Sequence, residues 1–510
     1  MAAEQRIRRA IFGSSPLVPR GMKRPRRSTL FSIAWNTLAA SSGRGVRITT
    51  SSLRFHAWIE HGRYFAAVCE HPVASVERRD DGSFAVTWRN GGVDHTVAAK
   101  GVVVATGRNN CPVIPTGLEA FSGRVMHAFD YPGREAFRGQ TVMMVGNSIS
   151  GLEIPTDLAK DPSIRVVSCC RKPRYIIQKT KDGVPSDWRF FNRVAAFASE
   201  TLPPDLAAEG LKEMIMSLFG NPADHGALRP SDNMLEAGIG QAQDYLELCA
   251  RGRILAKPMS VRFEGNEAVF DDGACEQIDV ILLGTGYRLH LPFLSEELRD
   301  ELNVGQSDLD LFDYTFAPTV AGLAFVGQYS QVGPYFPVLE LQGRYIARVF
   351  SGEHALPAED ERVRGAKAYR ALRDAKVPVP YHEAVLHVAR ALGVEPRLEE
   401  VPDLAAGIVF GPIVPSQFRL HGPGARPEAR EELAAALKSV GHQVAPPVDE
   451  QQLGMLRGLA SAPHPSPHLE RALAVLETRG TAESEMVEEP TALPATLDGA
   501  EQAGSQPLPS

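Results

Sequence analysis

The segment VMMVGNSISGLEIPTDLAK, residues 142–160, constrains the fold of this chain more than any other. An apolar run ends at Gly146 and a segment typical of a helix start follows, which gives the order strand, tight turn, helix. Gly146 permits the turn and Gly151 permits close packing of helix on strand, so backbone N–H groups at the helix N-terminus can bind a dinucleotide phosphate. Ser148 replaces the middle glycine of the usual G-x-G-x-x-G pattern, and its hydroxyl can donate to a phosphate oxygen. Taken alone, this degenerate pattern favours an ordinary strand–helix turn.

The cations after the next strand favour a nucleotide site over an ordinary strand–helix turn. The segment IRVVSCC leads into Arg171, Lys172 and Arg174, with no acidic residue among them. An NAD site carries an acidic residue here for the ribose 2′-hydroxyl, whereas cations suit the 2′-phosphate of NADPH. A short charge run is more often a solvated turn. Together, turn and cations favour an NADPH site made of Gly146, Ser148, Gly151, Arg171 and Lys172.

Strands alternate with helices along the chain, which indicates an α/β fold with parallel sheets. A β-meander over residues 83–107 ends in an apolar strand that is closed by Thr106 and Gly107. A later apolar strand, DVILL, runs into a turn that begins at Gly284. Separate strand–glycine turns at Gly146 and Gly284 predict two sheet-based domains.

Length, charge and cysteine usage exclude several classes of protein. The 510 residues are enough for two or three domains, and the net charge of −7 argues against nucleic acid as the main partner. The six cysteines show no C-x-x-C pair and no metal-ligand spacing, which predicts reduced thiols, a cytoplasmic location and no metal site. No apolar run approaches the roughly 20 residues of a membrane helix, so no membrane partner is expected.

Both ends of the chain are unusual in composition. Residues 1–64 form an atypical start, and residues 1–30 are basic like a transit peptide. A poorly structured or misassigned start is favoured, because apolar periodicity is missing as well. Residues 446–510 are rich in Pro, Ala, Ser, Thr and Glu, which predicts a disordered tail.

The segment FSGRVMHAFDY lies just before the nucleotide turn. Its pattern F-x-G-x-x-x-H-x-x-x-Y, at Phe121, Gly123, His127 and Tyr131, resembles the flavin-containing monooxygenases, which are class B flavoprotein monooxygenases. The related Baeyer–Villiger enzymes usually carry Trp at the last position, so Tyr131 favours the branch that oxygenates nitrogen and sulfur. The resemblance implies that His127 acts through the interdomain linker. The alternative interpretation of His127 is a purely structural one, a linker histidine that is hydrogen-bonded to the backbone. The two interpretations overlap, because both place the histidine in the linker.

The resemblance spans roughly residues 65–440, with several motifs in the family's order. The segment DVILLGTGY is similar to the family's late A-T-G-Y element, GQYSQVGPYFPVLELQGR to its flavin-side loop and helix, and FGPIVPSQFRLHGPG to its C-terminal segment. Ser330 stands where many members have Gln, which is a departure near the flavin. The matching positions are Gly284, Thr285, Gly286, Tyr287, Gly327, Gly333, Pro337, Glu340, Leu341, Gln342 and Arg344.

The family's architecture implies two Rossmann-like domains, with an NADPH domain inserted into an FAD domain. This insertion would explain why the turn at Gly146 lies so deep in the chain. The family opens with its own G-x-G-x-x-G for the FAD pyrophosphate, and residues 1–64 contain no such pattern. The FAD domain is therefore expected to be incomplete, with the strand Val102–Ala105 at an exposed sheet edge. The expected domains are an FAD-binding remnant with linker at 65–140, an NADPH-binding domain at 141–280, the continued FAD-binding domain at 281–355 and a C-terminal helical extension at 356–445.

The function that the resemblance implies is an NADPH- and FAD-dependent monooxygenase, which oxygenates soft nitrogen or sulfur nucleophiles through a peroxyflavin. The cofactor carries the chemistry, so no catalytic side chain is named. The partners are a small-molecule substrate and dioxygen, and the oligomeric state, including a homo-oligomer, stays open. Two alternatives remain, namely a Baeyer–Villiger monooxygenase acting on ketones and a catalytically impaired remnant that binds NADPH at most. The expected flavin-side residues are Thr106, Gly107, Gly284, Gly286, Tyr287, Gly327 and Gly333.

Overall fold

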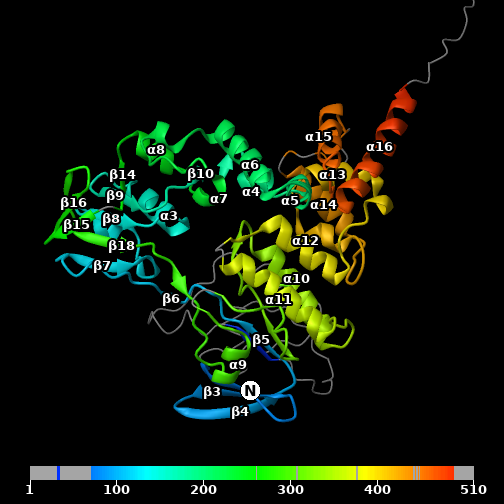
Figure 1. Ribbon diagram of the computed structural model, residues 1–510, viewed down its shortest axis with the longest axis horizontal. Helices are drawn as coiled ribbons and strands as arrows, with labels where there is room; N and C mark the ends of the chain where they lie inside the picture. The colour runs from blue at the N-terminus through cyan, green and yellow to red at the C-terminus, as the bar shows by residue number, and fades with distance from the viewer. Residues whose placement is uncertain are drawn as a thin grey trace, which may run out of the picture.

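The computed structural model describes residues 31–34, 71–259, 261–305, 308–374, 377–439, 441, 443, 446 and 448–487. Two parallel sheets organise this part of the chain, and helices pack around and beyond them (Figure 1). Most of the predicted atypical start, and the last part of the predicted tail, lie outside the described residues.

The larger sheet has five parallel strands in the order β14-β9-β8-β18-β7. Counted from β8 along the chain, the order 3-2-1-4 is that of a dinucleotide-binding sheet, in which the nucleotide crevice lies between the first and fourth strands. One face of the sheet packs on helices and the other on a small antiparallel sheet, β15-β16-β17. The strands are β7 (Arg124–His127), β8 (Thr141–Val145), β9 (Arg165–Cys170), β14 (Ile254–Pro258), β15 (Val261–Glu264), β16 (Glu267–Phe270), β17 (Cys275–Gln277) and β18 (Val280–Leu283).

The smaller parallel sheet consists of β1 (Phe31–Ala34), β5 (Val102–Ala105) and β20 (Leu323–Phe325), with β5 in the middle. The prediction that Val102–Ala105 lies at an exposed edge is therefore wrong. A short strand from the atypical start pairs with β5 in parallel, and it supplies hydrogen-bond partners that the edge would otherwise lack. The predicted meander is present beside this sheet as β2 (Val73–Arg78), β3 (Phe84–Asn90) and β4 (Val93–Ala99).

A short antiparallel pair, β6 (Cys111–Pro112) and β19 (Tyr287–Arg288), joins the two sheets. The chain leaves the β5 sheet through β6, builds the five-stranded sheet and returns through β19 to β20 (Figure 1). The predicted α/β class is thereby confirmed, and one sheet-based domain is inserted into the other.

The helices between β9 and β14 connect the inserted sheet to the later part of the chain. Phe190, Ile215 and Met234 share one hydrophobic core with Tyr345 and Val385. Much of the segment predicted as the NADPH-binding domain, 141–280, therefore packs against the C-terminal half as well as on its own sheet. The helices are α3 (Ile149–Leu158), α4 (Ser186–Phe190), α5 (Arg193–Thr201), α6 (Pro204–Phe219), α7 (Met234–Ala237), α8 (Tyr245–Ala250), α9 (Glu296–Glu301), α10 (Phe336–Phe350), α11 (Glu359–Asp374), α12 (Tyr381–Leu392), α13 (Ala405–Phe410) and α14 (Ala429–Lys438).

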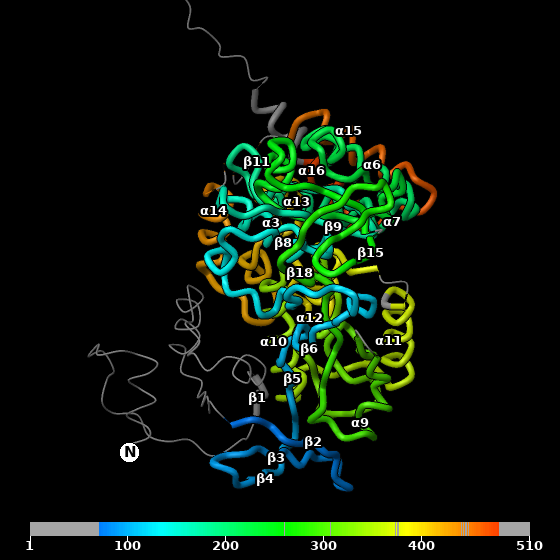
Figure 2. Tube along the Cα trace, turned by 90° about the vertical axis from the view of Figure 1, so that its left-hand side faces the viewer, coloured from blue at the N-terminus to red at the C-terminus, as the bar shows by residue number. Residues whose placement is uncertain are grey.

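The structure differs from the predicted disordered tail at 446–510. Two helices, α15 (Glu450–Ala460) and α16 (Pro467–Val487), form within this segment, far from the β2-β3-β4 sheet (Figures 1 and 2). Leu456, Leu469 and Leu476 are buried there together with residues of α5 and α13. The composition of the segment hid this core, because its few apolar residues are spread among Ala, Pro and Glu, and their packing partners lie far away in the sequence.

Candidate functional site

The predicted nucleotide turn lies between β8 and α3, at the carboxyl end of the inserted sheet. A Cβ atom on Gly151 would lie 2.4 Å from the carbonyl carbon and oxygen of Gly146. No side chain fits at that distance from backbone, so helix and strand touch through bare glycine. This close approach is what the third glycine of a dinucleotide fingerprint provides.

The same turn touches the end of β18. Gly146 has φ 132°, and a Cβ on it would lie 2.4 Å from the carbonyl oxygen of Gly284. The Gly284 N–H donates to the carbonyl of Val145 at 2.7 Å. The two glycine turns predicted separately from the sequence therefore meet at one point, between the first and fourth strands, where nucleotides bind in such sheets.

The N-terminus of α3 presents donors without competing acids. Ser148 is its N-cap residue, with an extended backbone and an exposed side chain whose hydroxyl accepts no hydrogen bond from the helix N–H groups. The first turn of α3 contains no acidic residue. The helix dipole and the first N–H groups therefore favour an anion at this end.

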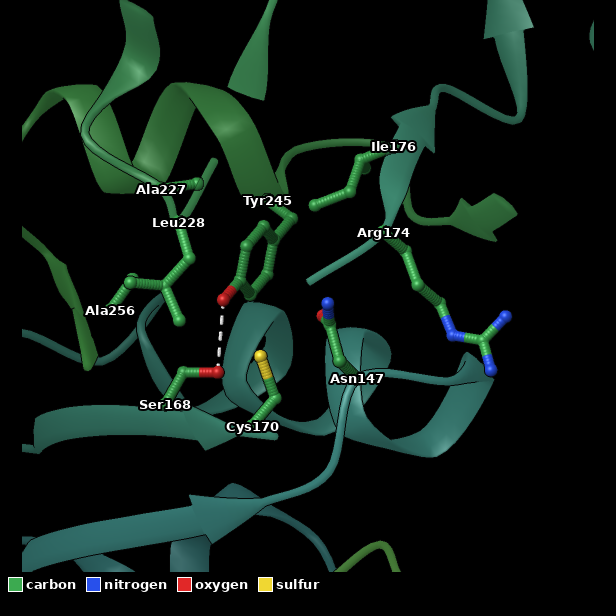
Figure 3. Close-up of a pocket in the computed structure, with 9 residues that line it drawn as sticks. All are labelled: Asn147, Ser168, Cys170, Arg174, Ile176, Ala227, Leu228, Tyr245 and Ala256. Atoms are coloured by element: carbon green, nitrogen blue, oxygen red, sulfur yellow. Dashed lines mark hydrogen bonds between the residues drawn. The ribbon is translucent and has the colours of Figure 1, made fainter. Parts of the chain in front are cut away.

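A small hollow opens beside the turn, at the carboxyl ends of β8 and β9 (Figure 3). Asn147, Cys170 and Arg174 line one part of it, and the Tyr245 hydroxyl lies 2.9 Å from the Ser168 hydroxyl in another. Burial raises the pKa of the Cys170 thiol to about 11, so this thiol is protonated at neutral pH. None of the nine residues that line the hollow is acidic.

The three predicted cations fall into two groups. Arg171 and Lys172 are exposed just after β9. Arg174 lines the hollow, and partial burial lowers its pKa. Its hydrogen bond to the carbonyl oxygen of Ile239 is long, at 3.5 Å. Arg174 thus lines the same hollow as Asn147, although the site predicted from the sequence includes Arg171 and Lys172 and not Arg174.

The first two residues of the family motif, Phe121 and Gly123, have a packing role. The Phe121 ring is buried and lies 5.2 Å from the Phe263 ring, centroid to centroid. A Cβ on Gly123 would lie 2.5 Å from the Phe121 ring and 2.7 Å from the carbonyl oxygen of Asp279. The motif therefore requires glycine two residues after the aromatic ring, because the ring and the start of β18 occupy the space.

His127 connects the linker to the turn after β18. Its side chain is 3% exposed. Nδ1 accepts the Phe129 N–H at 3.0 Å, so the ring proton is on Nε2, which donates to the carbonyl oxygen of Gly286 at 3.1 Å. Burial lowers the pKa of His127, and its ring lies edge-on to Tyr287 at 5.0 Å. The histidine is bonded to backbone, as the structural alternative for this motif position predicts.

Tyr131 anchors the other end of the motif to helix α3. Its hydroxyl donates to Asp157 at 2.9 Å, and Arg134 reaches the second oxygen of the same carboxylate at 2.7 Å. Burial raises the pKa of Tyr131, and Asp157 raises it further. Asp157 lies at the end of α3 opposite the predicted nucleotide turn. The motif therefore contacts helix α3, which begins at that turn, as well as the start of the inserted domain.

The predicted flavin-side residues fall in two places. Gly284 lies against the turn at Gly146 itself, and Gly286 and Tyr287 follow it on the way to the smaller sheet. The others lie apart from this turn, in the loops that follow strands β5 and β20 of the smaller parallel sheet. Gly107 follows β5 with φ 72°, and Gly327 follows β20 with φ 70°. Gln328 Nε2 donates to the carbonyl oxygen of Gly107 at 2.9 Å and thereby ties these two turns together. Thr106 precedes the first of them, at the end of the strand.

Gly333 occupies a crowded corner of the same loop. It has φ 101°, and a Cβ on it would lie 2.8 Å from Tyr381 Cβ and 2.9 Å from the Phe191 ring. The structure thus gives two separate groups of predicted site residues. One lies around Gly146, and the other lies around the turns after β5 and β20. Sequence reasoning missed Gln328, although a polar residue beside the glycine of a turn after a buried strand is a recognisable signal.

The model of the flavin-binding monooxygenase-like family matches residues 61–445, which is well over half of the chain. Flavin-containing monooxygenase 5 of Cavia porcellus is 27% identical over 387 residues, covering 71% of this chain and 71% of the relative. Dimethylaniline monooxygenase (N-oxide-forming) 2 of Pan troglodytes is 28% identical over 386 residues, with 71% of each chain covered.

Solved structures with a similar arrangement include S-allyl-L-cysteine S-oxygenase from Allium sativum. It shares 19% identity and a TM-score of 0.42, over 84% of this chain and 75% of that chain. Cyclohexanone monooxygenase from Rhodococcus sp. Phi1 bound to NADP+ shares 16% identity and a TM-score of 0.44, over 64% of this chain and 78% of that chain.

The chain belongs to the flavin-binding monooxygenase-like family and is a flavin-dependent monooxygenase. The predicted cofactors, FAD and NADPH, are those of the family. Within the described residues, no group of His, Cys, Asp and Glu is arranged to hold a metal ion. No helix in the described ranges has the length and apolar character needed to cross a membrane.

Proposed function

We propose that this chain is an NADPH- and FAD-dependent monooxygenase that oxygenates soft nitrogen or sulfur nucleophiles. The observation that carries the proposal is the turn between the first and fourth strands of the inserted sheet. There Gly146, Gly151 and Gly284 leave no room for a Cβ atom. A turn this tight leaves the N-terminus of α3 open to a pyrophosphate.

On the NADPH side, the Ser148 hydroxyl donates to a phosphate oxygen, and the absence of acids from the first turn of α3 avoids repulsion. Arg171, Lys172 and Arg174 bind the 2′-phosphate, which is a role for cations after the second strand. His127 and Tyr131 hold the insertion against the turn after β18 and against α3.

On the flavin side, the backbone of Thr106, Gly107, Gly327 and Gly333 lets the cofactor approach closely, and Gly286 with Tyr287 joins the two sites through the linker. When bound, FAD supplies the redox chemistry, taking hydride from NADPH and activating dioxygen. The protein supplies geometry and excludes water, so no side chain is required as an acid or nucleophile.

The substrate class rests on two observations. Tyr131 occupies the motif position at which the ketone-oxidising branch usually has Trp. A relative that is 28% identical to this chain is named for N-oxide formation. We place the enzyme in the cytoplasm, because the five cysteines within the described ranges are free thiols.

The test is the visible spectrum of the purified 510-residue chain supplied with FAD, followed by NADPH-dependent oxygen uptake. N,N-dimethylaniline, methyl phenyl sulfide and cyclohexanone serve as probes for the three candidate substrate classes. We expect a stoichiometric flavin band, and N-oxide or sulfoxide as product. An ester formed from cyclohexanone, with no product from the amine or the sulfide, would replace this proposal with the Baeyer–Villiger alternative.

A second candidate is a catalytically impaired remnant that binds NADPH at most. The observation that favours it is the absence of any G-x-G-x-x-G pattern from residues 1–64, since the FAD diphosphate needs free N–H groups at a helix N-terminus. The same spectrum separates the two candidates. A colourless chain that takes up no FAD but still binds NADPH would support the remnant.

A further inference from the structure

Two buried glutamines hold the turns on the flavin side. Gln342, on α10, is 0% exposed, and its carboxamide makes three hydrogen bonds. Oε1 accepts the Gly327 N–H at 3.1 Å, while Nε2 donates to the carbonyl oxygen of Tyr314 at 2.8 Å and to the Thr315 hydroxyl at 3.1 Å. A side chain that is fully desolvated and fully bonded fixes its partners, because each broken bond would leave a polar group unsatisfied.

Gln328 makes the second connection. It is 1% exposed, and its Nε2 donates to the carbonyl oxygen of Gly107 at 2.9 Å. Its Oε1 is buried without a hydrogen-bond partner. An unsatisfied buried acceptor is costly, so this side chain is not one that packing alone would select at the end of β20. Its bond sets the distance between the turn after β5 and the turn after β20.

The segment that supports Gln342 is itself strained. Asp313 and Tyr314 both have left-handed backbone, with φ 48° and 56°. Such conformations cost non-glycine residues about 1–3 kcal/mol each and persist where the surroundings determine them. The Asp313 carboxylate accepts from the Tyr345 hydroxyl at 3.1 Å and pairs with His387 at 2.7 Å. The Tyr314 ring stacks on Tyr329, in the flavin-side loop, at 5.0 Å.

We propose that Gln342 and Gln328 are positioning residues for the flavin, because their carboxamides fix the turns at Gly327 and Gly107 between which the cofactor is held. The inference rests on the proposed function, since it requires FAD. Both turns have a glycine with positive φ, so no side chain on Gly107 or Gly327 fixes their orientation. Loss of either carboxamide frees one turn while the hydrophobic core around it stays filled.

The experiment compares the full-length wild-type chain with Q342L and Q328L, which keep most of the side-chain volume and remove the hydrogen bonds. The FAD dissociation constant, the flavin reduction potential and the NADPH dissociation constant are measured for each variant. We expect each variant to bind FAD about tenfold more weakly, because each loses the one hydrogen bond that its glutamine makes to a flavin-side turn. We also expect a shifted flavin potential and an NADPH affinity within about twofold of wild type, because the NADPH turn lies in the other sheet.

A matched control is Q417L. Gln417 is also 0% exposed; it donates to the carbonyl oxygen of Pro412 at 2.8 Å and accepts from Arg193 at 3.5 Å, and neither partner belongs to a flavin-side turn. It should lower the melting temperature and leave the FAD affinity and potential unchanged. Should Q342L fail to fold, Q328L still tests the proposal, because it removes a single hydrogen bond.

The outcomes separate this inference from the proposed function. A wild-type chain that binds no FAD would overturn both. If the wild-type chain binds FAD, and Q342L and Q328L bind it equally well with an unchanged potential, the inference fails alone. It also fails if Q417L weakens FAD binding as much as they do, since the glutamines would then act only through general stability.

Discussion

At the scale of single residues, the Gly146–Gly151 contact leaves no room for a side chain where helix α3 meets the predicted nucleotide turn. Even one methyl group on Gly151 would lie 2.4 Å from the backbone of Gly146. We therefore expect Gly151→Ala to lower NADPH affinity at least tenfold, and Gly151→Val to abolish binding or unfold the inserted domain. Isothermal titration with NADPH measures the effect, and circular dichroism reports whether the variant folds.

Gly210→Ala is the matched control for this prediction. Gly210 lies inside helix α6, and a Cβ there would meet nothing within 4 Å. The substitution should stabilise the protein by up to about 1 kcal/mol, as alanine does in helix interiors, and leave NADPH binding unchanged. A Gly151→Ala variant with wild-type NADPH affinity would show that the turn does not bind the phosphates.

Substitution of the cations after β9 tests whether the protein prefers NADPH to NADH. Arg171 is exposed and contributes little to the fold, so its loss acts on the ligand. Removing a charge-assisted contact to the 2′-phosphate costs about 1.5–3 kcal/mol, so Arg171→Ala should weaken NADPH binding at least tenfold and leave NADH nearly untouched. Arg165, at the other end of β9 and paired with Glu276 at 2.7 Å, gives the control Arg165→Ala. Equal weakening of NADPH and NADH by Arg171→Ala would refute the assignment.

At the scale of elements, helix α12 carries a buried titratable group. His382 is buried, with Nδ1 unpartnered and Nε2 at 3.4 Å from the Ser199 hydroxyl. Burial lowers its pKa to about 4 from the ordinary 6.5. The unfolded chain therefore binds this proton at a higher pH than the folded chain does. Burial of the neutral histidine therefore costs no stability above pH 6.5, and the free energy of unfolding falls as the pH drops from 6.5 towards 4.

We expect this one group to cost the wild-type protein about 2–3 kcal/mol between pH 6.5 and pH 4. Urea unfolding at several pH values measures the loss. The variant His382→Gln should be less pH-sensitive over that window, while His95→Gln, at an exposed position on β4, should follow wild type. If His382→Gln and wild type lose stability in parallel, the histidine is not the group that titrates.

How far the sequence predicts these elements depends on whether the signal is local. Strand β8, its turn and α3 were predictable, because an apolar run, two glycines and a helix start lie within one short segment. Helices α15 and α16 were not, because the groups that bury Leu456 and Leu469 belong to α5 and α13. The role of Gln342 was hidden for the same reason. Its residue type fits the family motif, but its partners, Gly327 and Tyr314, are set by tertiary structure.

At the scale of the whole molecule, buried ion pairs join the insertion to the C-terminal half. Arg193, on α5, is 3% exposed and donates to Glu395 at 2.6 Å, and Arg390 of α12 reaches the other oxygen of that carboxylate at 2.7 Å. Arg390 also binds Glu200, on α5, at 2.6 Å. Burial alone would raise the pKa of Glu395, but Arg193 and Arg390 lower it, so the carboxylate stays charged. Glu395 is therefore the carboxylate that both arginines share.

Glu395→Gln should consequently destabilise the protein by about 3–5 kcal/mol, because it leaves Arg193 buried without a counter-charge. The effect should appear as a lower urea midpoint and as faster proteolysis of the α15–α16 region, since α5 also contributes Phe197 to the core that holds those helices. Glu353→Gln removes an acid from a solvent-exposed pair with Arg348 and should change stability by less than about 1 kcal/mol. A Glu395→Gln variant as stable as Glu353→Gln would mean that hydrophobic packing alone joins the insertion to the C-terminal half.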